Sequence, residues 1–130
     1  MTKMTDYKYR KLRKMVAQTK GVGIGVKSVL LCALHDYYKC RSVPEIQLFE
    51  EGNRRCLIGA ALHDKNMRPG KNEFGYYEDD WEDIAIKTFG INRKAANAII
   101  TGFDEVYRGH SKVSKLAHKV GVELGISYND

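Results

Sequence analysis

The stretch that most strongly suggests chemistry is CLIGAALHDK, residues 56–65, in which an apolar run ends in His63 and Asp64. The letters ALHD also occur earlier in the chain, where they end at Asp36. Histidine and aspartate both bind divalent metals, and a metal held in this way can activate water against a phosphoester. The alternative is a buried helix that ends in two polar residues, which hydrogen-bond locally. The two interpretations separate an enzyme from a binding protein.

The segment LIGAALHDK resembles the His-Asp step of HD-domain phosphohydrolases, in which an apolar helix carries adjacent metal ligands. In that family an upstream histidine and a downstream aspartate complete the site. The resemblance therefore implies a divalent-metal site formed by His35, His63, Asp64 and Asp104. The family's first histidine lies near the start of a helix, whereas His35 lies in the second half of one. We therefore keep the metal-dependent phosphohydrolase as an alternative, and expect no catalytic residue, metal or other cofactor.

Three cysteines, Cys32, Cys40 and Cys56, could in principle join His35 in a zinc site, because Cys32 and His35 lie on one helical face. The paired spacing typical of zinc sites is missing from the rest of the set. An odd number of cysteines without paired spacing is typical of free thiols in a reducing cytosol. We therefore predict free cysteines and a cytoplasmic protein.

The charge is concentrated near the N-terminus of a chain that carries a net charge of +6. Residues 1–35 contain eight Lys or Arg and only one acid, Asp6, whereas YYEDDWED, residues 76–83, is strongly acidic. A basic helix interleaved with tyrosines can neutralise phosphates and stack on bases, although a solvated outer face of a core helix is as common. The predicted binding residues are Tyr7, Lys8, Tyr9, Arg10, Lys11, Arg13 and Lys14, with a second strip of Lys112, Lys115 and Lys119.

The elements that must position these residues are mostly helical. Apolar residues at helical spacing predict five or six helices, over residues 5–20, 26–40, 56–64, from about 78 to 89, 92–108, and from 111 onward. The glycines of GVGIG, residues 21–25, should interrupt the helical pattern between the first two helices. Gly59 should let neighbouring parts of the chain come close to the helix over residues 56–64, which is apolar on every side. We expect Gly90 to end one helix, and Asn92 and Ser111 to cap the next two. Residues 45–56 allow at most one short β-hairpin.

RRCLIGAAL, followed by WEDIA and IITGFDEVYRGHSKVSKLAHK, resembles small uncharacterised proteins of bacteria and their phages. These proteins carry a Cys-Leu-x-Gly-Ala step, a helical stretch ending in an Asn-Asp-like pair, and a closing helix. Here Phe103 and Asp104 stand where that pair is expected, so no role of the pair is carried over. The resemblance implies that Cys56 and Gly59 form a packing step, and it points to an accessory protein.

We therefore expect a mainly α protein with a single compact domain over residues 1–130, in which residues 1–20 form a basic arm and residues 21–130 a helical core. No apolar run is long enough to span a membrane. The expected function is non-enzymatic binding of an anionic partner, which could be a host protein, a nucleotide signal or a nucleic acid. In its most concrete form the protein is a phage-type accessory or anti-defence inhibitor, and acts in the host cytoplasm if phage-encoded. A direct RNA or DNA binder is a further alternative.

Overall fold

A computed structural model describes residues 4–45, 49–76, 79–101 and 111–125. These residues form a mainly helical structure with one pair of very short strands, which confirms the predicted fold class. The elements are α1 (Asp6–Gln18), α2 (Ile24–Tyr38), β1 (Val43–Pro44), β2 (Arg54–Arg55), α3 (Leu57–Asp64), α4 (Trp81–Phe89), α5 (Arg93–Thr101) and α6 (Lys112–Glu123).

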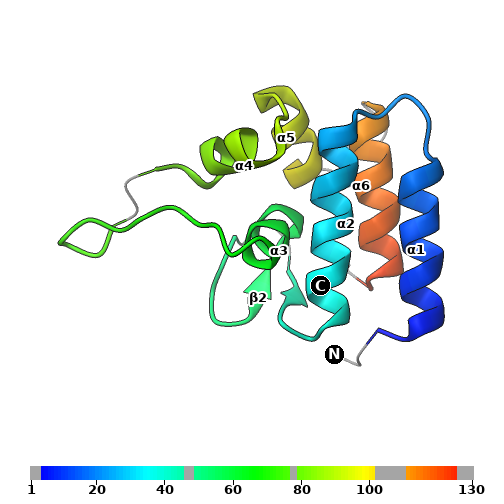
Figure 1. Cartoon of the computed structure of the whole chain (residues 1–130), viewed down its shortest axis with the longest axis horizontal. Helices are drawn as coiled ribbons and strands as arrows, with labels where there is room; N and C mark the ends of the chain where they lie inside the picture. The colour runs from blue at the N-terminus through cyan, green and yellow to red at the C-terminus, as the bar shows by residue number, and fades with distance from the viewer. Residues whose placement is uncertain (1–3, 46–48, 77–78, 102–110, 126–130) are drawn as a thin grey trace.

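Helix α2 is the centre of the molecule (Figure 1). Helix α1 runs alongside it on one side and also meets α6, and α3 packs against it on the other. Helices α4 and α5 form a hairpin that covers α3 and meets α6. The described residues that follow α3, 65–76, extend away from the body, on the side opposite α1 (Figure 1). The molecule therefore has two distinct ends along its longest axis.

The core lies mainly between α2 and α3. Six of the eight residues of α3 are buried, as predicted for a helix that is apolar on every side. Helix α1 contributes Leu12 and Val16 to the core, while Tyr9 and Met15 are partly buried on the same stripe. Because burial of each large apolar side chain stabilises the fold by roughly 1.5–3 kcal/mol, the contact between α2 and α3 contributes most to the stability of the core.

Gly59 allows the chain before α3 to pass directly over that helix. A Cβ atom placed on Gly59 would lie 1.8 Å from the carbonyl oxygen of Phe49, which no side chain can tolerate. The ring of Phe49 then stacks on Trp81, with 5.7 Å between ring centroids, and so connects α3 to the start of α4. The predicted close approach at Gly59 is confirmed.

Several predicted helix boundaries are confirmed by the caps. Gly90 adopts a left-handed conformation at the end of α4, and the Asn92 side chain accepts a hydrogen bond from the backbone of Ala95 at the start of α5. Ser111 forms a capping box with Ser114. Helix α4 begins at Trp81, capped by Asp80, a little after the predicted start. The predicted end of the next helix, near residue 108, lies outside the described residues.

Two local predictions need correction. Helix α2 begins at Ile24, so Gly25 lies inside the helix and not in the break. A Cβ atom there would lie 2.5 Å from the carbonyl oxygen of Phe89, so this glycine lets the α4–α5 turn pack on α2. The two strands are parallel, with Val43 opposite Arg54, and the only antiparallel element described near the predicted hairpin is a tight bridge between Glu51 and Arg54.

Candidate functional site: a crossed His–Asp cluster and a basic helix face

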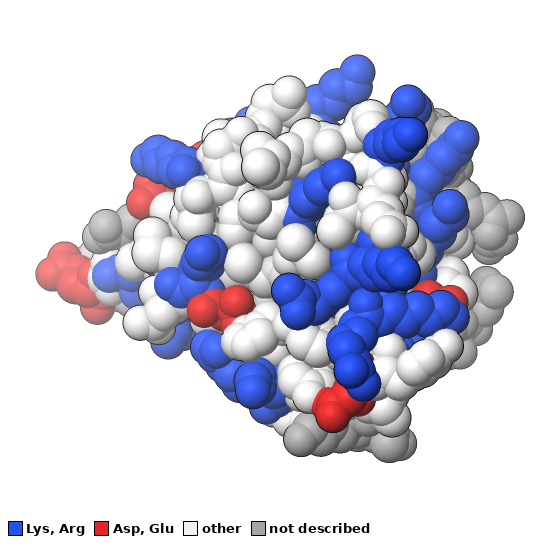
Figure 2. Space-filling model, turned by 45° about the vertical axis from the view of Figure 1, so that its right-hand side comes forward, with Lys and Arg blue, Asp and Glu red and all other residues white. Residues whose placement is uncertain are grey.

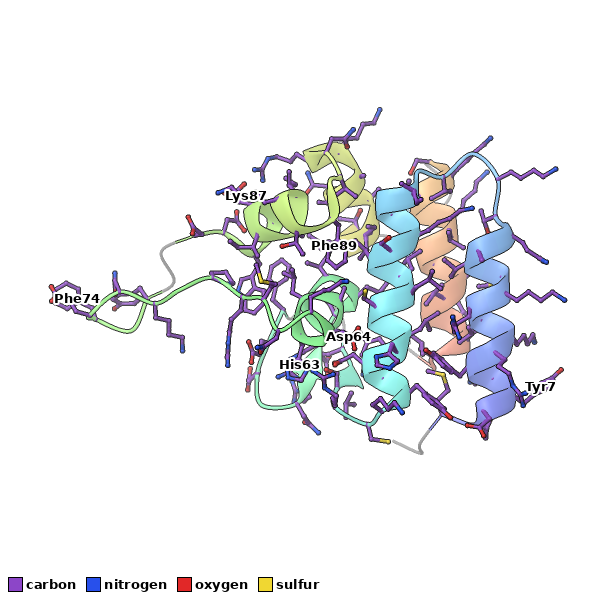
Figure 3. All side chains as sticks on the ribbon, in the orientation of Figure 1. Tyr7, His63, Asp64, Phe74, Lys87 and Phe89 are labelled. Carbon is purple, nitrogen blue, oxygen red and sulfur yellow. The ribbon has the colours of Figure 1, made fainter. Side chains whose placement is uncertain are left out.

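The two ALHD segments end helices α2 and α3, and their polar residues pair crosswise. The Nδ1 atom of His35 lies 2.6 Å from Oδ1 of Asp64, and Nδ1 of His63 lies 3.0 Å from Oδ1 of Asp36. Figure 3 shows His63 and Asp64 at the end of α3 nearest α2. The expectation that His63 and Asp64 hydrogen-bond locally is wrong, because their partners lie on another helix.

Asp36 is the centre of this cluster, and its side chain is fully buried. Besides His63, it accepts a hydrogen bond from the Ser42 hydroxyl, and the Arg41 guanidinium lies 3.2 Å away. Arg41 also reaches Asp64 at 3.5 Å and donates a hydrogen bond to the backbone carbonyl of His63 at 3.0 Å. A buried carboxylate is stable only when it is paired and hydrogen-bonded, and Asp36 meets both conditions.

A second layer of charged groups extends from Ser42 to the surface. The buried Arg55 guanidinium donates to the Ser42 hydroxyl at 2.9 Å and to Glu50 at 3.1 Å. Glu50 also accepts a hydrogen bond from the exposed Arg68 at 3.0 Å. The Tyr37 hydroxyl donates to the Arg55 carbonyl at 2.8 Å, and burial raises the pKa of this tyrosine well above its usual value. These contacts fasten the strand pair to α2.

The crossed arrangement leaves one nitrogen of each imidazole available. If each neutral ring donates its Nδ1 hydrogen to a carboxylate, Nε2 is left as an acceptor. His63 lines a small hollow of about 60 Å³, together with Glu50, Asn66, Met67, Arg68 and Trp81. The hollow has room for a few water molecules, so it is too small for an organic substrate in this conformation.

The four residues implied as a metal site are only partly brought together. His35 and Asp64 bond to each other, but His63 turns to Asp36, which is not in the set. Asp104 lies outside the described residues. Within the part of the chain that is described, no three His, Cys, Asp or Glu side chains are arranged as metal ligands.

The three cysteines are free thiols and occupy different environments. Cys40 is exposed, whereas burial raises the pKa of Cys32 and raises that of Cys56 to about 11. Cys56 precedes α3 and lies in the core, which agrees with the packing role that the resemblance implies.

The predicted basic residues of α1 form a continuous outer face. Arg10, Arg13 and Lys14 line an open hollow of about 280 Å³ between α1 and α2, with Ala17 and Leu31 as its apolar part. Figure 2 shows Lys and Arg side chains gathered over this side of the molecule, with few acidic side chains among them. We call this surface, made by Arg10, Arg13, Lys14, Ala17 and Leu31, the α1 hollow.

The other predicted binding residues surround the α1 hollow or lie apart from it. Tyr7 is 74% exposed and points away from the body (Figure 3), and Lys11 is exposed on the same outer side of α1. Lys8 is partly buried, and Tyr9 stacks on Tyr38 of α2 with 4.1 Å between ring centroids. The α6 strip is exposed at each of its predicted positions, Lys112, Lys115 and Lys119.

Lys27 was not among the predicted binding residues, although it belongs to this region. Its ammonium group donates a hydrogen bond of 2.8 Å to the carbonyl oxygen of Ala17, which is one of the residues of the α1 hollow. Asp36 and Arg41 were also missed in the His–Asp cluster. The repeated ALHD motif was the available signal for Asp36, because two helices that end in the same polar pair can satisfy each other.

Comparison with protein families, curated proteins and solved structures finds no match for this chain. In the described residues, no helix is both long and apolar enough to cross a bilayer. A function for this chain therefore has to be inferred from its own geometry.

Proposed function

We propose that this protein is a non-enzymatic binding protein that engages an anionic partner through the outer face of α1. The observation that carries the proposal is the α1 hollow, in which three cationic side chains surround an apolar surface. The only acid on α1 is Asp6, in its first turn, and its carboxylate accepts a hydrogen bond from Tyr38 and is not among the residues that line the hollow. Such a surface attracts anions over a distance of about one Debye length, roughly 8–10 Å at physiological salt.

The fold supports binding through a preformed surface. Tyr38 of α2 both stacks on Tyr9 and contacts Asp6, while Lys27 holds the carbonyl of Ala17, so α1 is fixed to α2 at both of its ends. The Arg13 guanidinium lies over the Tyr9 ring, 5.4 Å from its centroid. A surface that is ordered before binding loses less conformational entropy when the partner arrives. In the cell, we propose that such a protein acts as a phage-type accessory protein that inhibits or redirects a host component.

The crossed His–Asp cluster has a structural role in this proposal. It lies where α2 and α3 end, and its bonds join two buried helices. A phosphohydrolase site would instead need several ligands converging on one metal. Here His35 and His63 turn to carboxylates on opposite helices.

The test compares two charge-reversal variants of equal net charge by their elution from a heparin column. One carries Arg10→Glu, Arg13→Glu and Lys14→Glu in the α1 hollow, and the control carries Lys65→Glu, Lys87→Glu and Lys94→Glu at exposed positions on other helices or their ends. We expect the hollow variant to elute at a much lower salt concentration than the control. Equal elution of the two variants would contradict the proposal, because net charge alone would then explain retention.

The partner class is separated by titrating a fluorescent single-stranded oligonucleotide at several salt concentrations. For a nucleic-acid partner, the logarithm of affinity should fall linearly with the logarithm of salt. The hollow variant should then reduce the slope by about 2, or roughly 0.7 for each phosphate that the protein no longer neutralises. A shallow slope in the wild type would point to an acidic protein surface as the partner, in which case Tyr7→Ala should weaken binding of that partner strongly.

A further inference from the structure

After α3, the described residues 65–76 form a projecting arm whose end carries exposed aromatic side chains. The side chains of Phe74 and Tyr76 are 76% and 72% exposed. Figure 3 shows Phe74 at the far end of the arm, well away from the body. Two large aromatic side chains exposed on one projection are typical of an interaction site, and each buries a large area when it binds.

The end of the arm is an ordered turn. The Asn72 side chain accepts hydrogen bonds from the backbone N–H groups of Phe74 and Tyr76, at 2.9 and 3.1 Å. The backbone of Asn72 donates to the carbonyl of Tyr76 at 2.7 Å, and Gly75 supplies the positive φ that the turn requires. The aromatic side chains are thus presented on a closed loop, which lowers the entropic cost of docking them.

The charges near the end of the arm complement those of the α1 hollow. Glu73 and Asp79 are exposed, and neither carboxylate has a basic partner within the described part of the chain. Lys71 is the only base described between Gly70 and Asp80. The α1 hollow has the opposite character, because Arg10, Arg13 and Lys14 surround the apolar Ala17 and Leu31. The Glu73 carboxylate beside the exposed Phe74 ring therefore matches a basic hollow with an apolar part.

The arm and the α1 hollow lie at opposite ends of the molecule, so one chain cannot join them (Figure 1). We infer that the arm of one copy docks into the α1 hollow of a second copy, with Phe74 against Ala17 and Leu31 and Glu73 toward the guanidinium groups of Arg10 and Arg13. This inference rests on the proposed binding role of the α1 face, since the arm occupies the same surface as the anionic partner.

Such an interface is heterologous, because it joins two different surfaces. Each copy that docks leaves one free arm and one free hollow, so assembly continues from head to tail as an open chain or closes as a ring. An anionic partner that binds the hollow more tightly than the arm does would take the arm's place. The self-associated form is then a store of protein that the partner releases.

The experiment is sedimentation velocity of the full chain and of variants, at loading concentrations up to about 1 mM. The arm variant is Phe74→Ala, the hollow variant is Arg10→Glu, Arg13→Glu and Lys14→Glu, and the control is Val122→Ala, an exposed apolar residue on α6. We expect the wild type and the control to form species larger than dimers, and each interface variant alone to be monomeric. An equimolar mixture of the two variants should form dimers only, because it contains one intact hollow and one intact arm for each pair.

Three results would overturn the inference, and the first two are a wild type that stays monomeric over the whole concentration range and mixed variants that form no dimer. Neither would affect the proposed function, because Phe74→Ala leaves the α1 hollow unchanged and should keep the wild-type elution from heparin. If the hollow variant assembles like the wild type but elutes early from heparin, the arm docks elsewhere and only the inference fails.

Discussion

Asp36 combines complete burial with three different donors, from His63, Ser42 and Arg41. Its partner residues come from α3 and from the segment after α2, so a single carboxylate on α2 joins three parts of the chain. Removing this carboxylate leaves the buried Ser42 hydroxyl without its acceptor, which is costlier than losing the bond alone. The residue scale is therefore where the fold is most sensitive to small changes.

We predict that Asp36→Ala lowers the free energy of unfolding by about 1–3 kcal/mol, because the buried Ser42 hydroxyl and the His63 imidazole lose their acceptor, while Arg41 keeps Asp64 as a partner. Asp79→Ala, at an exposed position, is the matched control and should change stability by less than about 0.5 kcal/mol. Urea denaturation followed by circular dichroism measures both. Equal stability of the two variants would show that Asp36 does not hold the helix ends together.

Thiol reactivity offers a second prediction at this scale. Burial raises the pKa of Cys56 from 9.0 to about 11, so at about pH 8 its thiol stays protonated and unreactive in the folded state. As the pH rises, the Cys56 thiol loses its proton earlier in the unfolded state than in the folded state. The contribution of the buried, protonated thiol to the free energy of unfolding is therefore complete below pH 9.0 and is lost as the pH rises to about 11. A chromogenic disulfide reagent should modify the exposed Cys40 rapidly and Cys56 only after denaturant is added. Rapid modification of Cys56 in native buffer would mean that α3 opens readily.

At the scale of elements, helical periodicity and capping residues predicted most of the structure. Apolar spacing placed α1, α2 and α3 to within a few residues, because each buries a stripe or a whole surface against its neighbours. Gly90, Asn92 and Ser111 marked helix ends through their own local chemistry, which does not depend on the rest of the fold. The parallel pairing of Val43 with Arg54 was not predictable in this way, because it depends on where α2 and α3 lie relative to each other.

In the candidate sites too, features within one helix could be predicted from the sequence, and contacts between helices could not. The basic face of α1 was predicted from the sequence, because its side chains all lie on one helix. The crossed pairing of His35 with Asp64 and of His63 with Asp36 joins residues far apart in the chain, and only the packing of α2 on α3 brings them together. Leu31 and Lys27 complete the basic region from α2 for the same reason.

The close passage of the chain over α3 yields a prediction about Gly59. We expect Gly59→Ala to destabilise the fold by about 1–3 kcal/mol, because the new methyl group would displace the backbone at Phe49 and disturb its stacking on Trp81. Gly70→Ala is the control, since a Cβ atom there meets nothing within 4 Å. Thermal melts of the two variants provide the comparison. A Gly59→Ala melt that coincides with wild type would show that α3 and the Phe49 segment are not in tight contact.

At the scale of the whole molecule, the two proposed contact surfaces lie at opposite ends of the long axis. Basic side chains gather over α1 (Figure 2), and the arm that carries the exposed Phe74 projects from the opposite end (Figures 1 and 3). This polarity supports both the proposed anion binding and the proposed head-to-tail assembly. It also predicts that the two compete, so that adding a polyanion such as heparin should shift large species toward monomers.

The measurement that tests the central claim most directly is a nuclear magnetic resonance titration of the isotope-labelled protein with a short polyanion, inorganic polyphosphate. Phe74→Ala protein is used, so that self-association does not add its own shifts. We predict that backbone amide shifts concentrate at Arg10, Arg13, Lys14, Ala17 and Leu31, and that high salt removes them. Shifts confined to the surroundings of His63 or to α6, or an unchanged spectrum at low salt, would contradict the account.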